Sequence, residues 1–499
     1  MPQKVTSRRK FIKYLSFAGG SLAMGDMGAL FTFKDEATPD LVAEMIKQQI
    51  KGQIVKDHLL VEEYQTDFGR VIRKEPRLIV VPQDDDDIIT VFRIAEKYQV
   101  PVSLRGAGHT CYGQSLSDGG ILIVNNSRLA ESEATIKDGL VTVHSRTQWL
   151  ALEKQLNGQG LTSPVLTDYL ELTVGGTLSV GGYGLRSFQY GAQVDNIKEL
   201  ELILPSGEKT TCSPEKNTDL FRYSLCGLGQ LGLISKVKFK PIPYQRYTSV
   251  FYVLCTSVKD FIKNIKTILH PDFIKEIDHF SSYWLNGTFI IEIGSSFIEE
   301  NKAEEEKLKK KIGAQISFYK NSVVKDYHLY LHQIRGNWVE RYGVSHHVWE
   351  DYIFGIDQLE EFLNRAISET KISQYQNILP ALYIVACDTN QTRGIPFSPT
   401  YGNNNPMVYS VGFYYMVKYG NSSQLQTAKE HHQGFMKSCL ELKGKPYLYG
   451  WHDLTENQKI QFYGEDYTKL KSLKKQHDPA NIINPGVFVN PGKTAAQKI

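Results

Sequence analysis

The chain has 499 residues, which is long enough for two or three domains that each bury a core of their own. Its formal net charge is +3, and basic and acidic residues are interleaved, so the sequence does not indicate a nucleic-acid-binding protein. With 41% hydrophobic and 22% charged residues, the composition is that of an ordinary globular protein. The indications of function must therefore come from local motifs.

The first 37 residues predict an export signal. Arg8 and Arg9 precede a moderately apolar, glycine-containing run, residues 14–30. This pattern is typical of twin-arginine signals, which export proteins already folded, often around a cofactor. We expect a bacterial protein exported to the periplasm or the medium, without a stable membrane span once the signal is removed. A basic cap on a short N-terminal helix is the alternative interpretation, and the cleavage site and an uncleaved membrane tether stay open.

Residues 76–124 predict strands and a helix around a glycine-rich loop. Residues 104–115 follow an apolar run and contain too much glycine to continue as strand or helix. Backbone amides in such a loop suit a phosphate or pyrophosphate. The flanking elements are expected as strands at 76–83, 100–103 and 121–124 and a helix at 88–97.

A second glycine-rich stretch, residues 166–184, has five glycines within ten residues, and we expect irregular backbone shaped around a ligand. Residues 227–232 satisfy GxGxxG, but they lead into an alternating strand and not into a helix, which argues against dinucleotide binding of the Rossmann type. The other elements expected in the first half are a strand at 141–144, a helix at 147–156, and strands on both sides of a turn at 205–208.

Beyond Pro243 the glycine-rich loops stop. Residues 246–440 predict strands and amphipathic helices, and the charged run 299–311 is expected to be a solvated helix face. A helix is expected at 457–476, followed by a proline-glycine loop. No metal site is predicted, because His346 and His347 lack helical metal-ligand spacing and the six cysteines form no CxxC pair. The scattered cysteines are expected to be mostly buried free thiols.

The glycine motifs together resemble the cytokinin dehydrogenase family, within the vanillyl-alcohol oxidase or PCMH-type FAD-binding flavoproteins. The segments that carry the resemblance are 106–110, 167–170 with 174–179, and 227–232, together with Asp478-Pro479 and Pro485-Gly486. The resemblance implies an α+β fold with a PCMH-type FAD-binding domain and an α+β substrate domain. The implied division is a signal at 1–37, an FAD-binding domain at 38–245, a substrate domain at 246–440, and a return to the FAD domain at 441–499.

The same resemblance implies the site residues. His109 would carry FAD covalently, Asp168 would be the catalytic aspartate and also contact substrate, and Trp349 would contact substrate. On spacing alone, His109 is equally well explained as a structural histidine, and Asp168 is more often a turn or cap residue. The other positions where the family contacts FAD are Gly106, Ala107, Gly108, Thr110, Gln114, Thr173, Ser179, Tyr183, Ile234 and Tyr447.

The reaction implied is oxidation of the C–N bond that carries the side chain of N6-substituted adenines. Hydride would pass to the flavin while a carboxylate holds or removes the amine proton, and the imine would hydrolyse to adenine and an aldehyde. The partners expected are this small molecule and an electron acceptor, either a quinone or oxygen. The alternatives are a flavin oxidase of the same fold that acts on an alcohol, a sugar or another amine, and a flavin-holding protein without turnover, against which an intact Asp168 argues.

The sequence also departs from the family pattern. Residues 278–281 lack a glutamate that contacts substrate in the family, and Val348 replaces a proline before the pocket tryptophan. Asn484 and Val487 replace a serine and a glutamine that contact FAD. Glu171, not cysteine, stands at the second flavin-attachment position of berberine-bridge-type relatives, so a single covalent bond is predicted.

Overall fold

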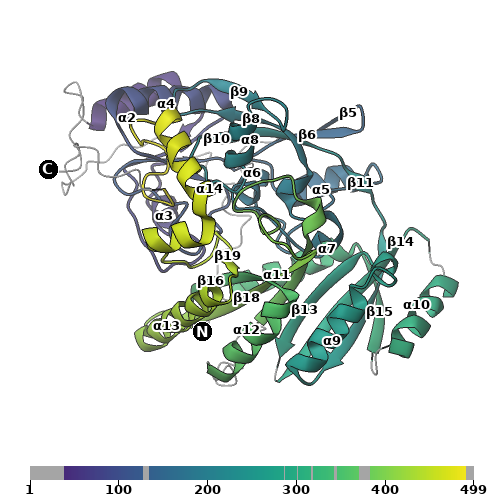
Figure 1. Cartoon of the computed structure of the whole chain (residues 1–499). Coiled ribbons are helices and arrows are strands. Elements are labelled where there is room, and N and C mark those ends of the chain that lie inside the picture. The colour runs from purple at the N-terminus through teal and green to yellow at the C-terminus, as the bar shows by residue number, and fades with distance from the viewer. Residues whose placement is uncertain are drawn as a thin grey trace, which may run out of the picture. The chain divides into compact units, whose positions relative to one another are not determined.

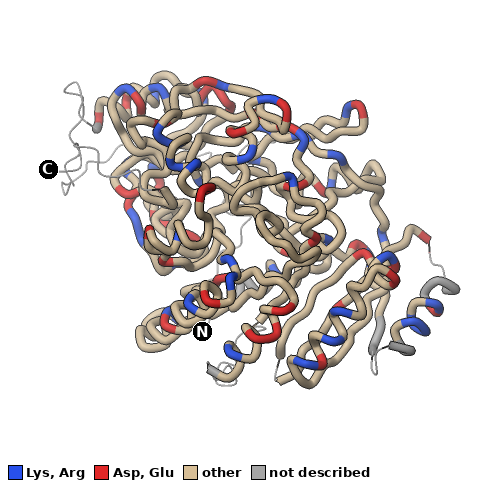
Figure 2. Tube along the Cα trace, in the orientation of Figure 1, with Lys and Arg blue, Asp and Glu red and all other residues tan. Residues whose placement is uncertain are grey.

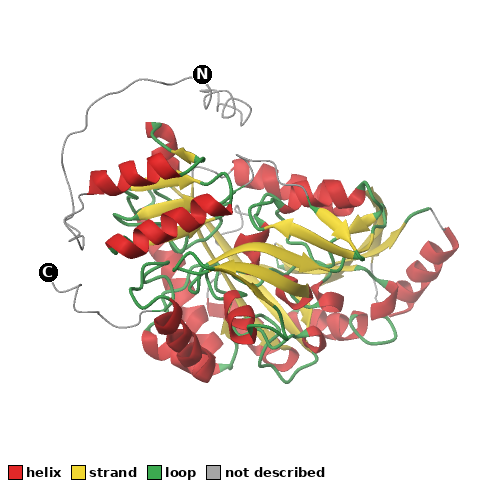
Figure 3. Cartoon of the chain, turned by 90° about the horizontal axis from the view of Figure 1, so that it is seen from above, coloured by secondary structure: helices red, strands yellow, loops and turns green. Residues whose placement is uncertain are grey.

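The computed structural model describes residues 39–126, 134–285, 287–299, 302–315, 319–341, 345–369 and 382–489. These residues all belong to one compact unit, Phe33–Ile499, built from both helices and sheets as an α+β fold requires (Figure 1). The export signal predicted at 1–37 lies outside the described residues. Helices flank the strands of the sheets (Figure 3).

The first sheet has four strands in the order β1-β2-β4-β3, with β2 and β3 both parallel to β4. The strands at 76–83 and 121–124 are confirmed, whereas the strand expected at 100–103 begins two residues later, because Pro101 has no N–H and Val102 is the first donor, to the carbonyl of Ile482. The elements are β1 (Gln53–Ile54), β2 (Leu78–Val81), β3 (Val102–Arg105) and β4 (Ile121–Val124), with helices α2 (Pro39–Gln49), α3 (His58–Glu63) and α4 (Asp85–Tyr98).

Helix α4 also ties this sheet to the next one. Asp84 caps its N-terminus, since the carboxylate accepts the Asp87 amide at 3.2 Å. Asp85, in the first turn, accepts the hydroxyl of Ser235 at 2.6 Å and lies 3.0 Å from the ring of His144. Asp84 and Asp85 therefore cap α4 and connect the first sheet to the second.

The second sheet is antiparallel, in the order β5-β6-β10-β8-β9. The strand at 141–144, the helix at 147–156 and the two strands around 205–208 are confirmed, and the GxGxxG segment is followed by a strand as expected. The elements are β5 (Thr135–Lys137), β6 (Leu140–His144), β8 (Ile197–Ile203), β9 (Lys209–Cys212) and β10 (Leu233–Phe239), a small pair β7 (Leu161–Thr162) with β11 (Ile242–Pro243), and helices α5 (Trp149–Asn157), α6 (Val174–Leu178), α7 (Ser187–Tyr190), η2 (Gln193–Asn196) and α8 (Thr218–Ser224).

The expectation that 166–184 is irregular throughout is wrong, because α6 is a regular helix within it. Thr173 caps this helix with its hydroxyl, which accepts the Gly176 amide at 3.2 Å. Glycine is needed at 175 for close approach: a Cβ there would lie 2.8 Å from the Cβ of Ser145. A good cap and tight packing thus offset the entropy cost of glycine in the helix.

The third sheet has eight antiparallel strands in the order β15-β12-β14-β13-β17-β18-β16-β19, and α9, α12 and α13 pack against it (Figure 1). Its strands are β12 (Tyr247–Cys255), β13 (His279–Leu285), β14 (Thr288–Phe297), β15 (Tyr319–Lys325), β16 (Ser345–Gly355), β17 (Leu382–Asp388), β18 (Met407–Lys418) and β19 (Lys445–Pro446). The helices in this part are α9 (Val258–Ile268), η3 (Ile274–Glu276), α10 (Lys302–Gln315), α11 (Tyr327–Arg341), α12 (Ile356–Glu369), η5 (Thr389–Gln391), α13 (Ser422–Glu441) and α14 (Glu456–His477).

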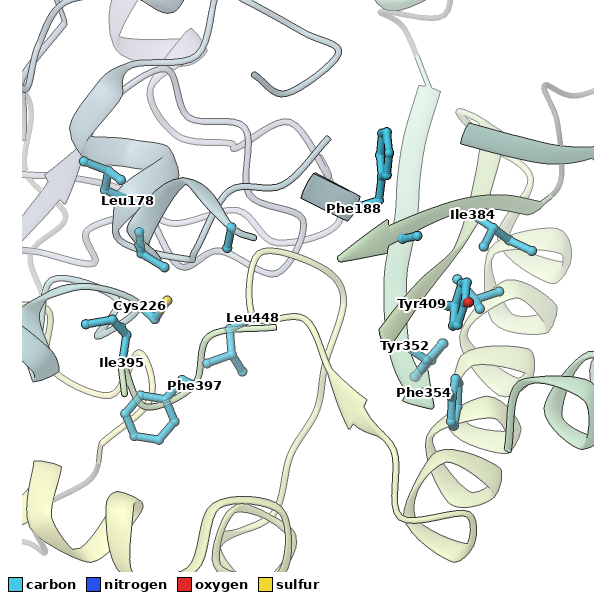
Figure 4. Close-up of a cluster of buried hydrophobic side chains, with 14 of the residues drawn as sticks. Leu178, Phe188, Cys226, Tyr352, Phe354, Ile384, Ile395, Phe397, Tyr409 and Leu448 are labelled. Carbon is cyan, nitrogen blue, oxygen red and sulfur yellow. The ribbon is translucent and has the colours of Figure 1, made fainter. Parts of the chain in front are cut away.

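The two faces of this sheet differ, because side chains alternate along each strand. One face joins an apolar core that also includes Leu178 of α6, so the core is continuous between the glycine-rich half and the large sheet (Figure 4). Tyr352, Ile384 and Tyr409 contribute to that core from three neighbouring strands. The opposite face carries polar and aromatic side chains, several of which line the cavity described below.

The C-terminal part contacts both halves. Strand β19 pairs with β16 of the large sheet, while Ile483 forms a parallel bridge with Val102 of β3. The helix expected at 457–476 corresponds to α14, which is kinked at Gly464. The domain boundaries at 245 and 440 stay a prediction.

Charged residues of both signs are interspersed along the chain (Figure 2). Within the described residues, every helix is too short or too polar to cross a bilayer. All six cysteines are buried free thiols, as the sequence indicates.

Candidate active site

A cavity with about 1490 Å³ of atom-free space, its open mouth included, lies between the glycine-rich loops and the polar face of the large sheet. It brings together every residue predicted from the sequence as a cofactor or substrate contact, although their individual roles stay predictions. Those residues are Gly106, Ala107, Gly108, His109, Thr110, Gln114, Asp168, Thr173, Ser179, Tyr183, Ile234, Trp349 and Tyr447.

Asp67 holds the glycine loop, residues 104–115, in place. Its buried carboxylate accepts the hydroxyl of Thr110 at 2.8 Å and the amide of Gly113 at 2.6 Å. Burial raises the pKa of Asp67 to about 6, while these hydrogen bonds act in the opposite direction. At Gly106, a Cβ would lie 2.2 Å from the hydroxyl oxygen of Thr173, so glycine lets the loop approach the cap of α6.

His109 stands in a stack of rings. It lies 3.9 Å from the ring of Phe68, which in turn stacks on His347 at 4.1 Å, and the ring of Tyr169 lies 5.3 Å away. Burial lowers the pKa of His109 to about 3, and nearby His347 adds to the effect. The imidazole is therefore neutral near pH 7 and held in one orientation.

Asp168 lies in a part of the cavity where several buried polar atoms have no partner. Its Oδ2 lies 3.4 Å from Nη2 of Arg335, whereas Oδ1 is buried and unpartnered. The hydroxyl of Tyr383 and the indole nitrogen of Trp349 are buried and unpartnered as well, and both residues line the cavity. Together they present an acceptor, a hydroxyl and an N–H donor, a set that fits a polar ligand.

A second carboxylate, Asp351, lies in the cavity wall among hydroxyl groups. It accepts hydrogen bonds from Tyr183 at 2.7 Å, Tyr449 at 2.7 Å and Tyr414 at 3.2 Å. Burial raises the pKa of Asp351, and the tyrosine hydroxyls lower it in part. Gly412 makes room for this cluster, because a Cβ there would lie 2.4 Å from the Tyr414 hydroxyl.

Apart from Trp349, sequence reasoning missed this sheet-side wall. The signal that could have found it is the alternation of polar or aromatic with apolar residues along β16, β17 and β18, which places the former on one face. Arg335, on a helix, has no such signal. The missed lining residues discussed here are Tyr169, Asp351, Tyr383, Tyr414 and Tyr449.

Residues noted as departures fall in different places. Asn484 lines the cavity, but its side chain serves the backbone: Oδ1 accepts the Leu104 amide at 2.8 Å and Nδ2 donates to the Leu228 carbonyl at 3.0 Å. Val348 is buried in the core behind Trp349. Asp278 accepts the Ser296 amide at 2.6 Å and does not line the cavity.

The histidine pair is structural in its contacts. His346 and His347 each place Nδ1 2.7 Å from a backbone carbonyl, of Arg70 and Phe68 respectively, and so fasten β16 to the turn before the glycine loop. Among the described residues, no group of three histidine, cysteine, aspartate or glutamate side chains could hold a metal ion.

The cavity fits FAD. Its wall includes glycine-rich backbone that can approach a pyrophosphate, and hydroxyl groups of Thr110, Ser115 and Ser179 stand along it. Residues 76–213 match a family described as an FAD binding domain. They include the glycine loop and α6.

Relatives extend the match. Cytokinin dehydrogenase 3 of Oryza sativa subsp. japonica is 26% identical over 474 residues, which cover 85% of this chain and 89% of the relative. Cytokinin dehydrogenase 3 of Arabidopsis thaliana is 35% identical over 198 residues, and an uncharacterized oxidoreductase in the fasciation locus of Rhodococcoides fascians is 36% identical over 168 residues. Together these matches support a cytokinin dehydrogenase-like PCMH flavoprotein.

The stronger matches of this cytokinin dehydrogenase-like flavoprotein are partial. They cover 38% of the Arabidopsis relative and 38% of the Rhodococcoides relative, and 38% and 34% of this chain. Together with the FAD binding domain, the matches support an FAD-dependent oxidoreductase. The substrate is a matter for proposal.

Proposed function

We propose that this flavoprotein oxidises the C–N bond that carries the side chain of N6-substituted adenines, the cytokinins, and releases adenine and an aldehyde. The observation that carries the proposal is the unpartnered, buried Oδ1 of Asp168 in a cavity that fits FAD and is walled by Tyr169, Trp349 and Tyr383. The family match supports the same chemistry.

In the proposed mechanism Asp168 accepts the proton of the substrate amine through Oδ1. FAD, when bound, supplies the acceptor for the hydride that leaves the adjacent carbon. Loss of this proton and hydride turns the amine into an imine, which water hydrolyses to adenine and the aldehyde. The aromatic side chains hold the planar substrate and exclude water from the reacting atoms.

We further propose that FAD is attached covalently through His109. A neutral imidazole has a lone pair for bond formation, and burial keeps the pKa of His109 near 3. The ring stack with Phe68 fixes its direction. Glu171 is not among the residues that line the cavity and offers no thiol, which supports a single attachment.

Export by the twin-arginine route to the periplasm or the medium belongs to the same proposal, and it rests on Arg8, Arg9 and the apolar run after them. The electrons would leave to a quinone or to oxygen. Folding around FAD before export agrees with the way this route carries its cargo.

A second candidate is oxidation of an alcohol, a sugar or another amine by the same site. It is favoured by the thin resemblance of the middle of the sequence to the family and by the altered residues 278–281. Asp168 could accept a hydroxyl proton in the same geometry.

The deciding experiment is anaerobic mixing of the purified protein with N6-isopentenyladenine while the visible flavin band is followed. Rapid bleaching, with adenine released after a single turnover, supports the proposal. If the band persists in a protein that dithionite reduces, cytokinin oxidation is wrong, and a panel of alcohols, sugars and amines tests the second candidate.

A further inference from the structure

Arg335 reaches Asp168 from a distant part of the chain. The two residues are 167 positions apart, and Arg335 belongs to α11, which lies over the polar face of the large sheet. Nη2 of the guanidinium lies 3.4 Å from Oδ2 of Asp168, and the two side chains are only 20% and 15% exposed. Arg335 does not line the cavity, so it contacts the carboxylate from behind.

The guanidinium makes one further contact, and the helix that carries it makes another. Its central carbon lies 5.1 Å from the centre of the Tyr383 ring, a cation–π geometry. Three residues earlier on the same helix, the ring of His332 accepts the amide of Leu170 at 3.1 Å. Helix α11 thus holds the Asp168 loop at both the backbone and the carboxylate.

A second carboxyl group lies near the same arginine. Glu292 on β14 accepts the hydroxyl of Tyr327. Burial and the charge of Asp168 raise the pKa of Glu292 to about 7, and Arg335 acts in the opposite direction. One guanidinium therefore compensates two neighbouring acids in a place where unpaired carboxylates would be costly.

Resting on the proposed role of Asp168, we propose that Arg335 is a positioning residue for the oxidation. By binding Oδ2, it fixes the carboxylate and turns Oδ1 toward the substrate amine. Oδ1 is the atom that lacks a partner, and Oδ2 is the atom that the guanidinium contacts. The arginine touches neither substrate nor flavin and acts through the aspartate.

The test measures rapid-mixing flavin reduction in three variants, with whichever substrate bleaches the wild-type flavin. Arg335→Met is expected to lower the limiting rate about 10–100-fold while the substrate dissociation constant changes less than about 3-fold. Arg335→Lys should recover most of the rate. Arg335→Ala should be accelerated by millimolar guanidinium, which a merely structural role would not produce.

Arg365→Met is the matched control, because Arg365 makes ion pairs with Glu361 and Glu441 on the surface. It should reduce its flavin at the wild-type rate. FAD content measured by absorbance shows whether each variant is folded, and if Arg335→Met fails to hold FAD, the lysine variant and guanidinium rescue of the alanine variant decide.

An unchanged limiting rate in Arg335→Met overturns the inference, and so does a slow alanine variant that guanidinium does not accelerate. Neither result touches the proposed function, which is judged by whether N6-isopentenyladenine bleaches the wild type. If another amine or an alcohol bleaches the flavin instead, the cytokinin proposal fails while the arginine test proceeds with that substrate.

Discussion

The two walls of the cavity are built in different ways. The cofactor-side wall consists of short loops and the start of α6, where glycines such as Gly106 allow close backbone approach. The sheet-side wall consists of side chains that alternate along paired strands, among them Trp349, Asp351 and Tyr383. A local motif can encode the first wall, but the second exists only once distant strands have paired.

The family match follows the same division. The FAD binding domain match ends at residue 213, before the large sheet begins at β12. Backbone geometry tolerates few changes, whereas a side chain on a strand face can change without altering the strand. The comparison predicts that cofactor chemistry is set by the first wall and substrate choice by the second.

The largest effect is expected on the cofactor side. His109→Ala removes the only proposed attachment point, so all flavin should appear in the supernatant after acid precipitation, while the wild-type pellet stays yellow. His347→Ala serves as the control, since it keeps the attaching imidazole. Colour retained in the His109→Ala pellet would show that the covalent link lies elsewhere.

The next largest effect is expected for a substitution of Asp168. Asp168→Asn removes the proposed proton acceptor but keeps the shape, so flavin reduction should slow by about 10²–10⁴-fold with the flavin still bound. Stopped-flow absorbance measures the rate, and flavin content is the control. A rate within about 3-fold of wild type would remove Asp168 from the mechanism.

The smallest effect is a pH dependence of stability. In the folded protein the pKa of Glu292 is raised from its usual 4.5 to about 7, so its protonated form stabilises the fold at low pH. This stabilisation is lost as the pH rises through about 7. Glu292→Gln removes it, so the stability of the variant relative to wild type should rise by about 1–3 kcal/mol between pH 4.5 and 8. Urea unfolding at both pH values measures the difference.

Glu199→Gln is the matched control for this measurement. Glu199 pairs with Lys238 on the partly exposed side of the second sheet. If both variants gained the same stability relative to wild type between the two pH values, the buried environment of Glu292 would not be the cause of the gain.

The sequence predicted the elements whose signals are local. The apolar run at β2, the capped aspartate run at α4 and the strand after GxGxxG all need only neighbouring residues. Helix α6 was missed because its glycines are tolerated only through the contacts of Gly175 and Thr173. Propensity alone carries no information about such packing.

The candidate site follows the same rule. The residues expected to contact FAD, and Asp168, could be assigned to one cavity from the sequence because they lie in motifs that resemble a family. Arg335 could not, because its partner is 167 residues away and nothing in α11 marks it. Asp351 could have been predicted, because it lies two residues after Trp349 on the same face of the same strand.

The contacts of Asn484 have a consequence for the order of events during synthesis. Its side chain binds the backbone at Leu104, 380 residues earlier, and at Leu228. At about 5–20 residues per second, a ribosome needs roughly 20–80 s to make the intervening residues. The contacts that Asn484 makes with both glycine-rich segments therefore form only after residue 484 has been made, long after those segments have left the ribosome.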